Sequence, residues 1–144
     1  MEVVQKALAA YAMGDADGFV ESMTDDAVVR PSAFISGQTE YRGRAAARQG
    51  VRDGASILSE HGNRLRLHPY ATYTDAADPR RVLSLGRLTI IRSDGGSFGS
   101  DVAYLWTLDG DQIAGLDTWL DHDQGLAQLA APVEAGRPRL ALAR

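Results

Sequence analysis

The stretch that decides the fold is residues 82–121, VLSLGRLTIIRSDGGSFGSDVAYLWTLDGDQIAGLDTWLD. Three strand patterns in this stretch are separated by Asp94-Gly95-Gly96 and by Asp109-Gly110. Asp-Gly steps are strong hairpin signals because glycine readily takes the positive φ that a tight turn needs. The stretch therefore predicts three long antiparallel strands joined as hairpins.

Alternation within these strands separates two faces of the predicted sheet. Val102, Tyr104 and Trp106 share one face, since residues two apart point to the same side of a strand. Residues 82–92 are apolar on both faces, and a strand of that kind needs a cover on each side. We expect helices to cover one face and predict a homodimer that covers the other.

The first half of the chain is mainly helical. Apolar residues recur at helical spacing in 2–13 and 15–23, and an alanine-rich pattern runs from 44 to about 57. Helices followed by antiparallel strands indicate an α+β fold, in which a curved mixed or antiparallel sheet packs on the N-terminal helices. Such a sheet leaves a cone-shaped cavity, the usual place for a ligand. The other expected elements are a short or edge strand at 27–29 before Pro31, a loop at 32–41, a strand at 64–73 interrupted by Pro69, and a helix from 121 or 123 to about 130.

Composition excludes several classes of protein. The 144 residues are 44% hydrophobic and 24% charged, which is typical of one globular domain. A net charge of −4 argues against nucleic-acid binding, which needs a clustered positive field. There is no cysteine, no apolar run approaches the length of a membrane helix, and the three histidines lack metal-ligand spacing. We expect a cytoplasmic protein without metal, cofactor, nucleic-acid or membrane partner.

Six short motifs follow one another along the chain. They are AYAMGD at 10–15, DDAVV at 25–29, YRGRA at 41–45, VAYLWTLDGDQI at 102–113, WLD at 119–121 and GLAQL at 125–129. Their order and spacing resemble the SnoaL-like family, within the nuclear transport factor 2-like and ketosteroid isomerase-like superfamily. The resemblance implies a single cystatin-like, cone-shaped domain over residues 1–131, an apolar pocket and a homodimer. Residues 132–144 are expected to form a C-terminal tail.

Members of this family include isomerases, polyketide cyclases, epoxide hydrolases, dehydratases and proteins with no known reaction. Where a ketosteroid isomerase has its base and its donor tyrosine, this chain has Pro31 and Ala7. A limonene-type epoxide hydrolase uses an Arg-x-Asp pair, but here Thr89 stands two residues after Arg87. The resemblance therefore favours cofactor-independent acid/base chemistry of the polyketide cyclase or isomerase kind. An epoxide hydrolase-like activity and a non-catalytic module that binds a small ligand or dimerises remain alternatives.

Two carboxylates are candidate catalytic groups. Asp121 matches the aspartate that cyclases of this family place between the last strand and the closing helix. Asp117 lies four residues earlier, so in a regular strand it shares the face of Asp121, and the two could act as an acid/base pair. The alternative for Asp121 is a helix N-cap. Asp117 would point outward if Leu116 and Thr118 face the cavity.

Tyr104 is the third catalytic candidate, since its hydroxyl could donate a hydrogen bond to a ligand carbonyl. Trp106 could form an apolar wall, although core packing is the alternative for both aromatic residues. Arg30, at the end of the short strand, could pair with a ligand carboxylate or lie on the surface. The expected ligand is an apolar or partly polar small molecule. The remaining candidates for ligand contact are Val102, Trp119 and Phe19.

Overall fold

The computed structural model describes residues 2–31 and 40–136. The elements in these two ranges are α1 (Glu2–Ala12), α2 (Ala16–Val20), β1 (Met23–Arg30), β2 (Tyr41–Arg42), α3 (Arg44–Glu60), β3 (Arg64–Asp75), β4 (Asp78–Ile91), β5 (Ser97–Asp109), β6 (Gln112–Trp119), α4 (His122–Leu126) and β7 (Pro132–Gly136). The strands form one sheet in the order β2-β1-β6-β5-β4-β3-β7.

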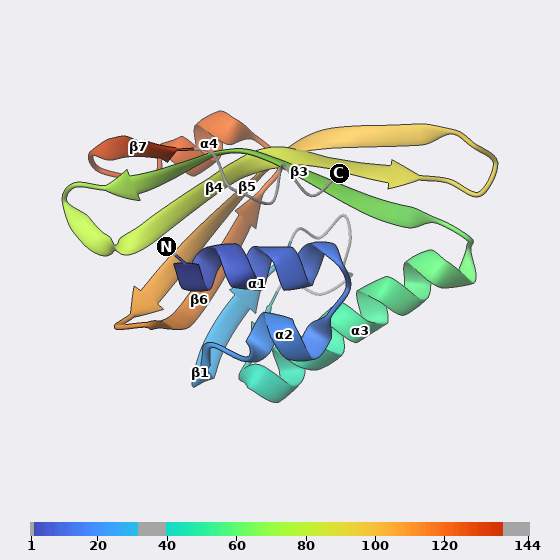
Figure 1. The fold of residues 1–144 in the computed structure, drawn as a ribbon, viewed down its shortest axis with the longest axis horizontal. Helices are drawn as coiled ribbons and strands as arrows, with labels where there is room; N and C mark the ends of the chain where they lie inside the picture. The colour runs from blue at the N-terminus through green and yellow to red at the C-terminus, as the bar shows by residue number, and fades with distance from the viewer. Residues whose placement is uncertain (1, 32–39, 137–144) are drawn as a thin grey trace.

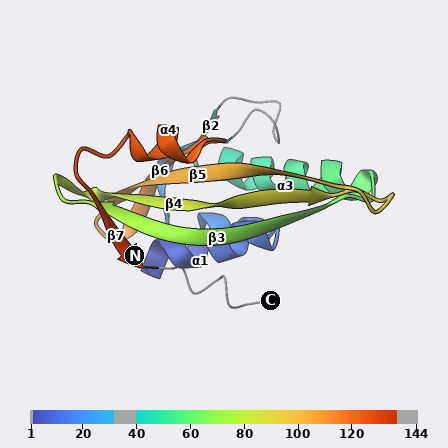
Figure 2. The ribbon, with the colours of Figure 1, turned by 90° about the horizontal axis from the view of Figure 1, so that it is seen from above.

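The sheet is curved and packs on the N-terminal helices, as Figure 1 shows. Helices α1, α2 and α3 lie on its inner face, and α4 lies on its outer face (Figures 1 and 2). Neighbouring strands are antiparallel except for β1 and β6, which run parallel. This arrangement confirms the predicted α+β fold with a curved mixed sheet.

The predicted hairpins of the second half are confirmed. Strand β4 pairs with β5 from Arg81 opposite Thr107 to Ile91 opposite Ser97. The turns after β4 and β5 contain Gly95 at φ 88° and Gly110 at φ 64°. An L-residue with a Cβ rarely adopts such φ values, so glycine fixes the position of each turn.

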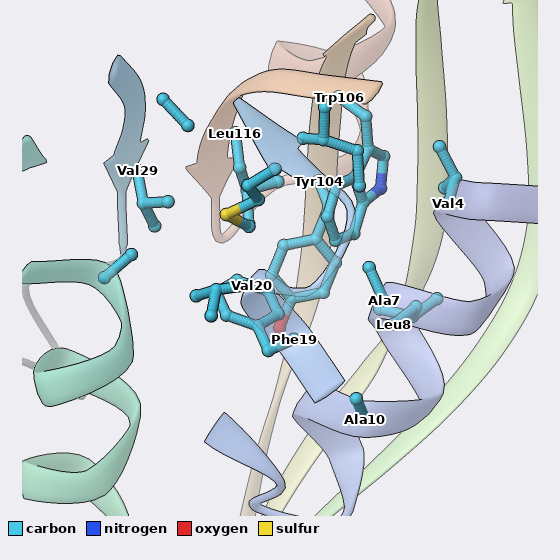
Figure 3. Close-up of a cluster of buried hydrophobic side chains, with 14 of the residues drawn as sticks. Val4, Ala7, Leu8, Ala10, Phe19, Val20, Val29, Tyr104, Trp106 and Leu116 are labelled. Atoms are coloured by element: carbon cyan, nitrogen blue, oxygen red, sulfur yellow. The ribbon is translucent and has the colours of Figure 1, made fainter. Parts of the chain in front are cut away.

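Two hydrophobic clusters hold the sheet, one on each face. The inner cluster contains Phe19, Tyr104 and Trp106 and lies between the sheet and helices α1–α3 (Figure 3). The outer cluster contains Leu83, Leu85, Ala103, Leu105 and Leu129, with Tyr73, Trp119 and Leu126 packed against it. Helix α4 and the segment after it therefore cover Leu83 and Leu85. The second cover that β4 needs at these residues thus comes from the same chain.

Strand β1 differs from the expected short or edge strand. Met23, expected at the end of a helix, begins β1, which runs to Arg30 and has neighbours on both sides. Proline was expected to keep this segment at an edge, since it donates no ladder hydrogen bond. Pro31 follows the last residue of the strand, so no ladder hydrogen bond is lost.

Pro69 bends β3 without interrupting it. The pairing with β4 shifts register between Pro69 and Ala71, which is a β-bulge. Beyond the bulge the alternation changes phase, so that Thr72, which in a regular strand would share the side of the exposed Arg66 and His68, is buried. Gly86 lies opposite Pro69, and a Cβ at Gly86 would stand 2.7 Å from the His68 carbonyl oxygen. Glycine therefore permits the close approach of the two strands at the bulge.

Residues 132–144 were expected to be a tail, but residues 132–136 form β7 at the edge of β3. Asp75 holds this segment in place. Its carboxylate accepts hydrogen bonds from the backbone N–H groups of Ala77, Ala130 and Ala131, at 2.9, 3.0 and 3.0 Å. These bonds hold the pKa of Asp75 below its usual value, with that from Ala77 the largest contribution. The predicted loop at 32–41 ends earlier than expected, since Tyr41 begins β2. Residues 32–39 of this loop and the rest of the tail, 137–144, lie outside the described residues.

Candidate functional site

A cavity of about 320 Å³ lies between the inner face of the sheet and the helices. The sheet contributes Val29 from β1, Tyr104 from β5, and Leu116 and Thr118 from β6. Tyr104 stands directly opposite Thr118 in the pairing of β5 with β6, so both side chains leave the same face. Phe19 of α2 also lines it. The predicted apolar cavity is thus present where the curved sheet meets the helices.

Small residues of α3 make room for this cavity. Gly50 and Gly54 both line it, and each glycine in a helix interior costs about 1 kcal/mol relative to alanine. The Tyr41 ring covers Gly50, where an added Cβ would come within 2.7 Å of it. At Gly54 an added Cβ would have no atom within 4 Å. The open space beside Gly54 therefore belongs to the cavity.

Tyr104 brings a polar group to this apolar space. Its side chain is 3% exposed, and its hydroxyl oxygen has no hydrogen-bond partner among the described residues. The Tyr104 ring stands beside Trp106 (Figure 3), at 6.3 Å between centroids, and the Tyr11 ring stands edge-on to it at a centroid distance of 5.9 Å. Burial raises the pKa of Tyr104 well above its usual value, and the Tyr11 hydroxyl, which stands close by but outside hydrogen-bond geometry, raises it further. The phenol therefore stays protonated and can donate to an acceptor.

Tyr104→Phe is expected to leave the free energy of unfolding of the unliganded protein unchanged or to raise it by about 1 kcal/mol. The substitution removes a buried hydroxyl that lacks a partner, and such a group opposes folding. Urea denaturation followed by circular dichroism measures the change. The matched control is Ser84→Ala, because Ser84 faces Tyr104 across β4 and β5 and accepts a hydrogen bond from Trp106. This control should lose about 1–3 kcal/mol, and an equal loss in Tyr104→Phe would contradict the assignment.

Of the side chains predicted to contact ligand, Phe19 and Tyr104 line the cavity. Val102 and Trp106 are fully buried beside it, in the inner cluster, and do not line it. Trp106 Nε1 donates to Ser84 Oγ at 3.2 Å, and its ring meets Phe19 edge-on at 6.4 Å between centroids. Both residues thus support the cavity wall from behind.

The predicted carboxylates lie elsewhere. Leu116 and Thr118 face the cavity, so Asp117 between them points to the outer face. There the Asp117 carboxylate accepts a hydrogen bond of 3.0 Å from Arg30, which is half-exposed and also pairs with Glu40. Asp121 is the N-cap of α4, where its Oδ1 accepts from the Gln124 N–H at 3.0 Å. The structure brings neither carboxylate, nor Arg30, into the lining.

Trp119 also lies outside the cavity. It packs against the outer cluster, on the opposite face from Tyr104. Its strand neighbour Ala103 belongs to the same cluster, in agreement with the pairing of the two residues across β5 and β6.

The described part of the lining contains no carboxylate and no histidine. Its polar side chains belong to three tyrosines and to the residues Ser59, Asn63, Arg64 and Thr118. Sequence reasoning missed Tyr11 and Tyr41, named Thr118 only as a condition on the direction of Asp117, and did not use the two α3 glycines as a sign of a cavity. Two glycines one turn apart in an otherwise helical pattern are a usable signal, because they indicate a face with room for a neighbour.

Residues 2–31 and 40–136 contain no cluster of metal-ligating side chains and no helix that could span a membrane. No group of three or more His, Asp or Glu side chains in these ranges could hold a metal ion. None of the helices within the same ranges is long and apolar enough to cross a membrane.

The described part of the chain is thus a curved sheet that forms an apolar cavity against three N-terminal helices, and this architecture indicates the class of protein. The SnoaL-like domain family matches residues 4–116, which include every lining element except the end of β6. The chain therefore belongs to the SnoaL-like family. The sequence matches no curated protein.

Several solved structures share the fold at low sequence identity. TerC, co-crystallized with polyporic acid, has a TM-score of 0.67 and 16% identity over 89% of this chain and 95% of its own. A candidate polyketide cyclase of Xanthomonas campestris pv. campestris has a TM-score of 0.65 and 15% identity over 88% and 93%. An NTF2-like protein of unknown function from Burkholderia pseudomallei has a TM-score of 0.64 and 16% identity over 91% and 97%. At these identities the likeness establishes the fold alone.

Proposed function

We propose that the cavity binds a small, mostly apolar molecule that carries a hydrogen-bond acceptor. The observation that carries this proposal is the Tyr104 hydroxyl, which is buried without a partner at the wall of an apolar cavity. Buried polar groups are nearly always hydrogen-bonded, so an orphaned donor in a cavity indicates a missing acceptor. A ligand carbonyl beside Tyr104 would satisfy it. The report of a ligand bound to the similarly folded TerC is consistent with this use of the fold.

Cyclase or isomerase chemistry is the second candidate, and the Tyr11–Tyr104 pair favours it. The two rings lie 5.9 Å apart between centroids, and neighbouring phenols can donate hydrogen bonds to the negative charge that develops on an enolate oxygen. Such a reaction also needs a base, and the described lining offers no carboxylate or histidine. Residues 32–39, SAFISGQT, contain neither residue type. Binding therefore requires fewer additional groups than catalysis.

An epoxide hydrolase-like site finds no support in the geometry. The only arginine in the middle of β4, Arg87, shares its strand face with Leu83 and Leu85 of the outer cluster. It pairs with Asp101 at 3.5 Å on that face, away from the cavity. A homodimer and a single domain that ends near residue 131 remain predictions from the sequence.

Gly54→Leu tests the binding proposal. A leucine side chain at this position would enter the open space of the cavity, where an added Cβ meets no atom within 4 Å. We expect the affinity for N-phenyl-1-naphthylamine, an uncharged aromatic fluorophore, to fall at least about tenfold because the leucine occupies its volume. The free energy of unfolding should not fall, since leucine is the better helix former by about 0.5–1 kcal/mol. Fluorescence titration measures the affinity, and denaturation measures the stability.

Ser56→Leu is the matched control for this experiment. Ser56 is exposed on α3, two residues from Gly54, and does not line the cavity. The control adds the same side chain to the same helix and should leave the affinity within about twofold of the unchanged protein. Unchanged binding by Gly54→Leu would show that the probe does not occupy this cavity and would remove the proposal.

A further inference from the structure

Arg64 is the one charged residue in the described lining of the cavity. It is the first residue of β3 and is exposed. Met13 and Ser59 are also exposed lining residues, whereas Phe19 and Tyr104 are buried. The cavity therefore has an open end, where the exposed Arg64 lies, and an inner end, where the buried Tyr104 lies.

Arg64 also differs from most of the other described arginines in having no partner. Within residues 2–31 and 40–136 its side chain forms no ion pair, and Glu60, four residues earlier, lies beyond ion-pair distance. By contrast, Arg30, Arg87 and Arg92 each pair with an aspartate. The Arg64 guanidinium is therefore available to an anion that arrives from outside.

We infer that the ligand of this cavity is an organic anion, whose charged group Arg64 binds at the open end while its apolar body fills the inner end. The inference rests on the proposed function and adds the charge of the ligand. A guanidinium presents N–H groups in a planar fork that fits a carboxylate or a sulfonate. The described part of the lining has no acidic side chain to repel such a group. Carboxylates and other singly charged anionic groups share this chemistry.

The test compares two probes with the same ring system. 8-Anilinonaphthalene-1-sulfonate carries one negative charge, and N-phenyl-1-naphthylamine carries none. Arg64→Met keeps an unbranched side chain and removes the charge. Fluorescence titrations should show that this variant binds the sulfonate about tenfold more weakly, as expected for a lost charge-assisted hydrogen bond. Its affinity for the uncharged probe should change by less than about twofold.

Two further variants make the test specific. Arg66→Met removes an exposed charge from the same strand at a position that does not line the cavity, so both probes should bind as before. Arg64→Lys retains the charge and should recover most of the sulfonate affinity. An equal loss in Arg66→Met would indicate a general effect of surface charge and would overturn the inference.

Gly54→Leu separates the failure of this inference from the failure of the proposed function. If both probes bind and Gly54→Leu weakens both, the cavity is the binding site. An undiminished sulfonate affinity in Arg64→Met would then overturn the charge assignment and leave the binding proposal intact. If neither probe shows binding that depends on Gly54, both proposals fail.

Discussion

Trp106→Ala is expected to lower the free energy of unfolding by about 3–5 kcal/mol. Trp106 has no exposed surface and is among the largest fully buried side chains in the described part of the chain. It contacts Phe19 and Tyr104 through its ring and Ser84 through Nε1. The substitution would remove the indole, leave a void behind the cavity wall and leave Ser84 without its donor. The free energy of unfolding of a domain of this size is about 5–15 kcal/mol in total, so the expected loss is a large fraction of it.

The measurement is urea denaturation followed by far-ultraviolet circular dichroism, since the substitution removes one of the two tryptophans that fluorescence would report. Trp119→Ala is the matched control. It deletes the same side chain from β6, but Trp119 is only partly buried and packs at the margin of the outer cluster. We expect a smaller loss there. A greater loss in Trp119→Ala than in Trp106→Ala would show that the inner cluster is not the main source of stability.

Gly125→Ala is expected to lower the free energy of unfolding by about 1–3 kcal/mol, despite the higher helix propensity of alanine. Gly125 is buried in α4, where the helix backbone lies directly on the sheet. An added Cβ would stand 2.5 Å from the Ala103 Cβ and 3.3 Å from Leu83 Cδ1. Ala103 lies on β5, which β4 and β6 hold in place on both sides. Helix α4 would therefore have to move away from the outer cluster.

A double-mutant cycle with Ala103→Gly checks this explanation. Removal of the Ala103 methyl makes room for the new one, so the double variant should be more stable than the sum of the two single effects, by about 1–2 kcal/mol. Urea denaturation of the four proteins gives this coupling energy. Simple additivity would mean that the Gly125 and Ala103 contact does not set the position of α4.

The fold was predictable from the sequence where its causes are local. Short segments alone determine the Asp-Gly turns and the alternation of Val102, Tyr104 and Trp106. The structure confirms both the hairpins and the inward direction of these three side chains. Strand β1 was predicted less well. Its place beside β6 depends on pairing between distant residues, such as Val29 with Leu116, which no local pattern reports.

The candidate site was predictable only in part. The inward position of Tyr104 follows from strand alternation, and the same alternation directs Asp117 outward once Leu116 and Thr118 face the cavity. The choice between these two phases of β6 depends on its register with β5, which sequence alone left open. The absence of a carboxylate from the described lining and the isolation of Arg64 at its open end are properties of the tertiary arrangement.

The parallel pairing of β1 with β6 has a consequence for how the protein assembles. Met23 pairs with Ile113, about ninety residues away, whereas β4, β5 and β6 meet their partners through short turns. Closure of a long loop is entropically unfavourable and slows the formation of distant contacts. We therefore expect the three hairpin strands to form early during folding and the strand that carries Val29 to dock late. The space for the ligand would then come into existence in one of the last steps of folding.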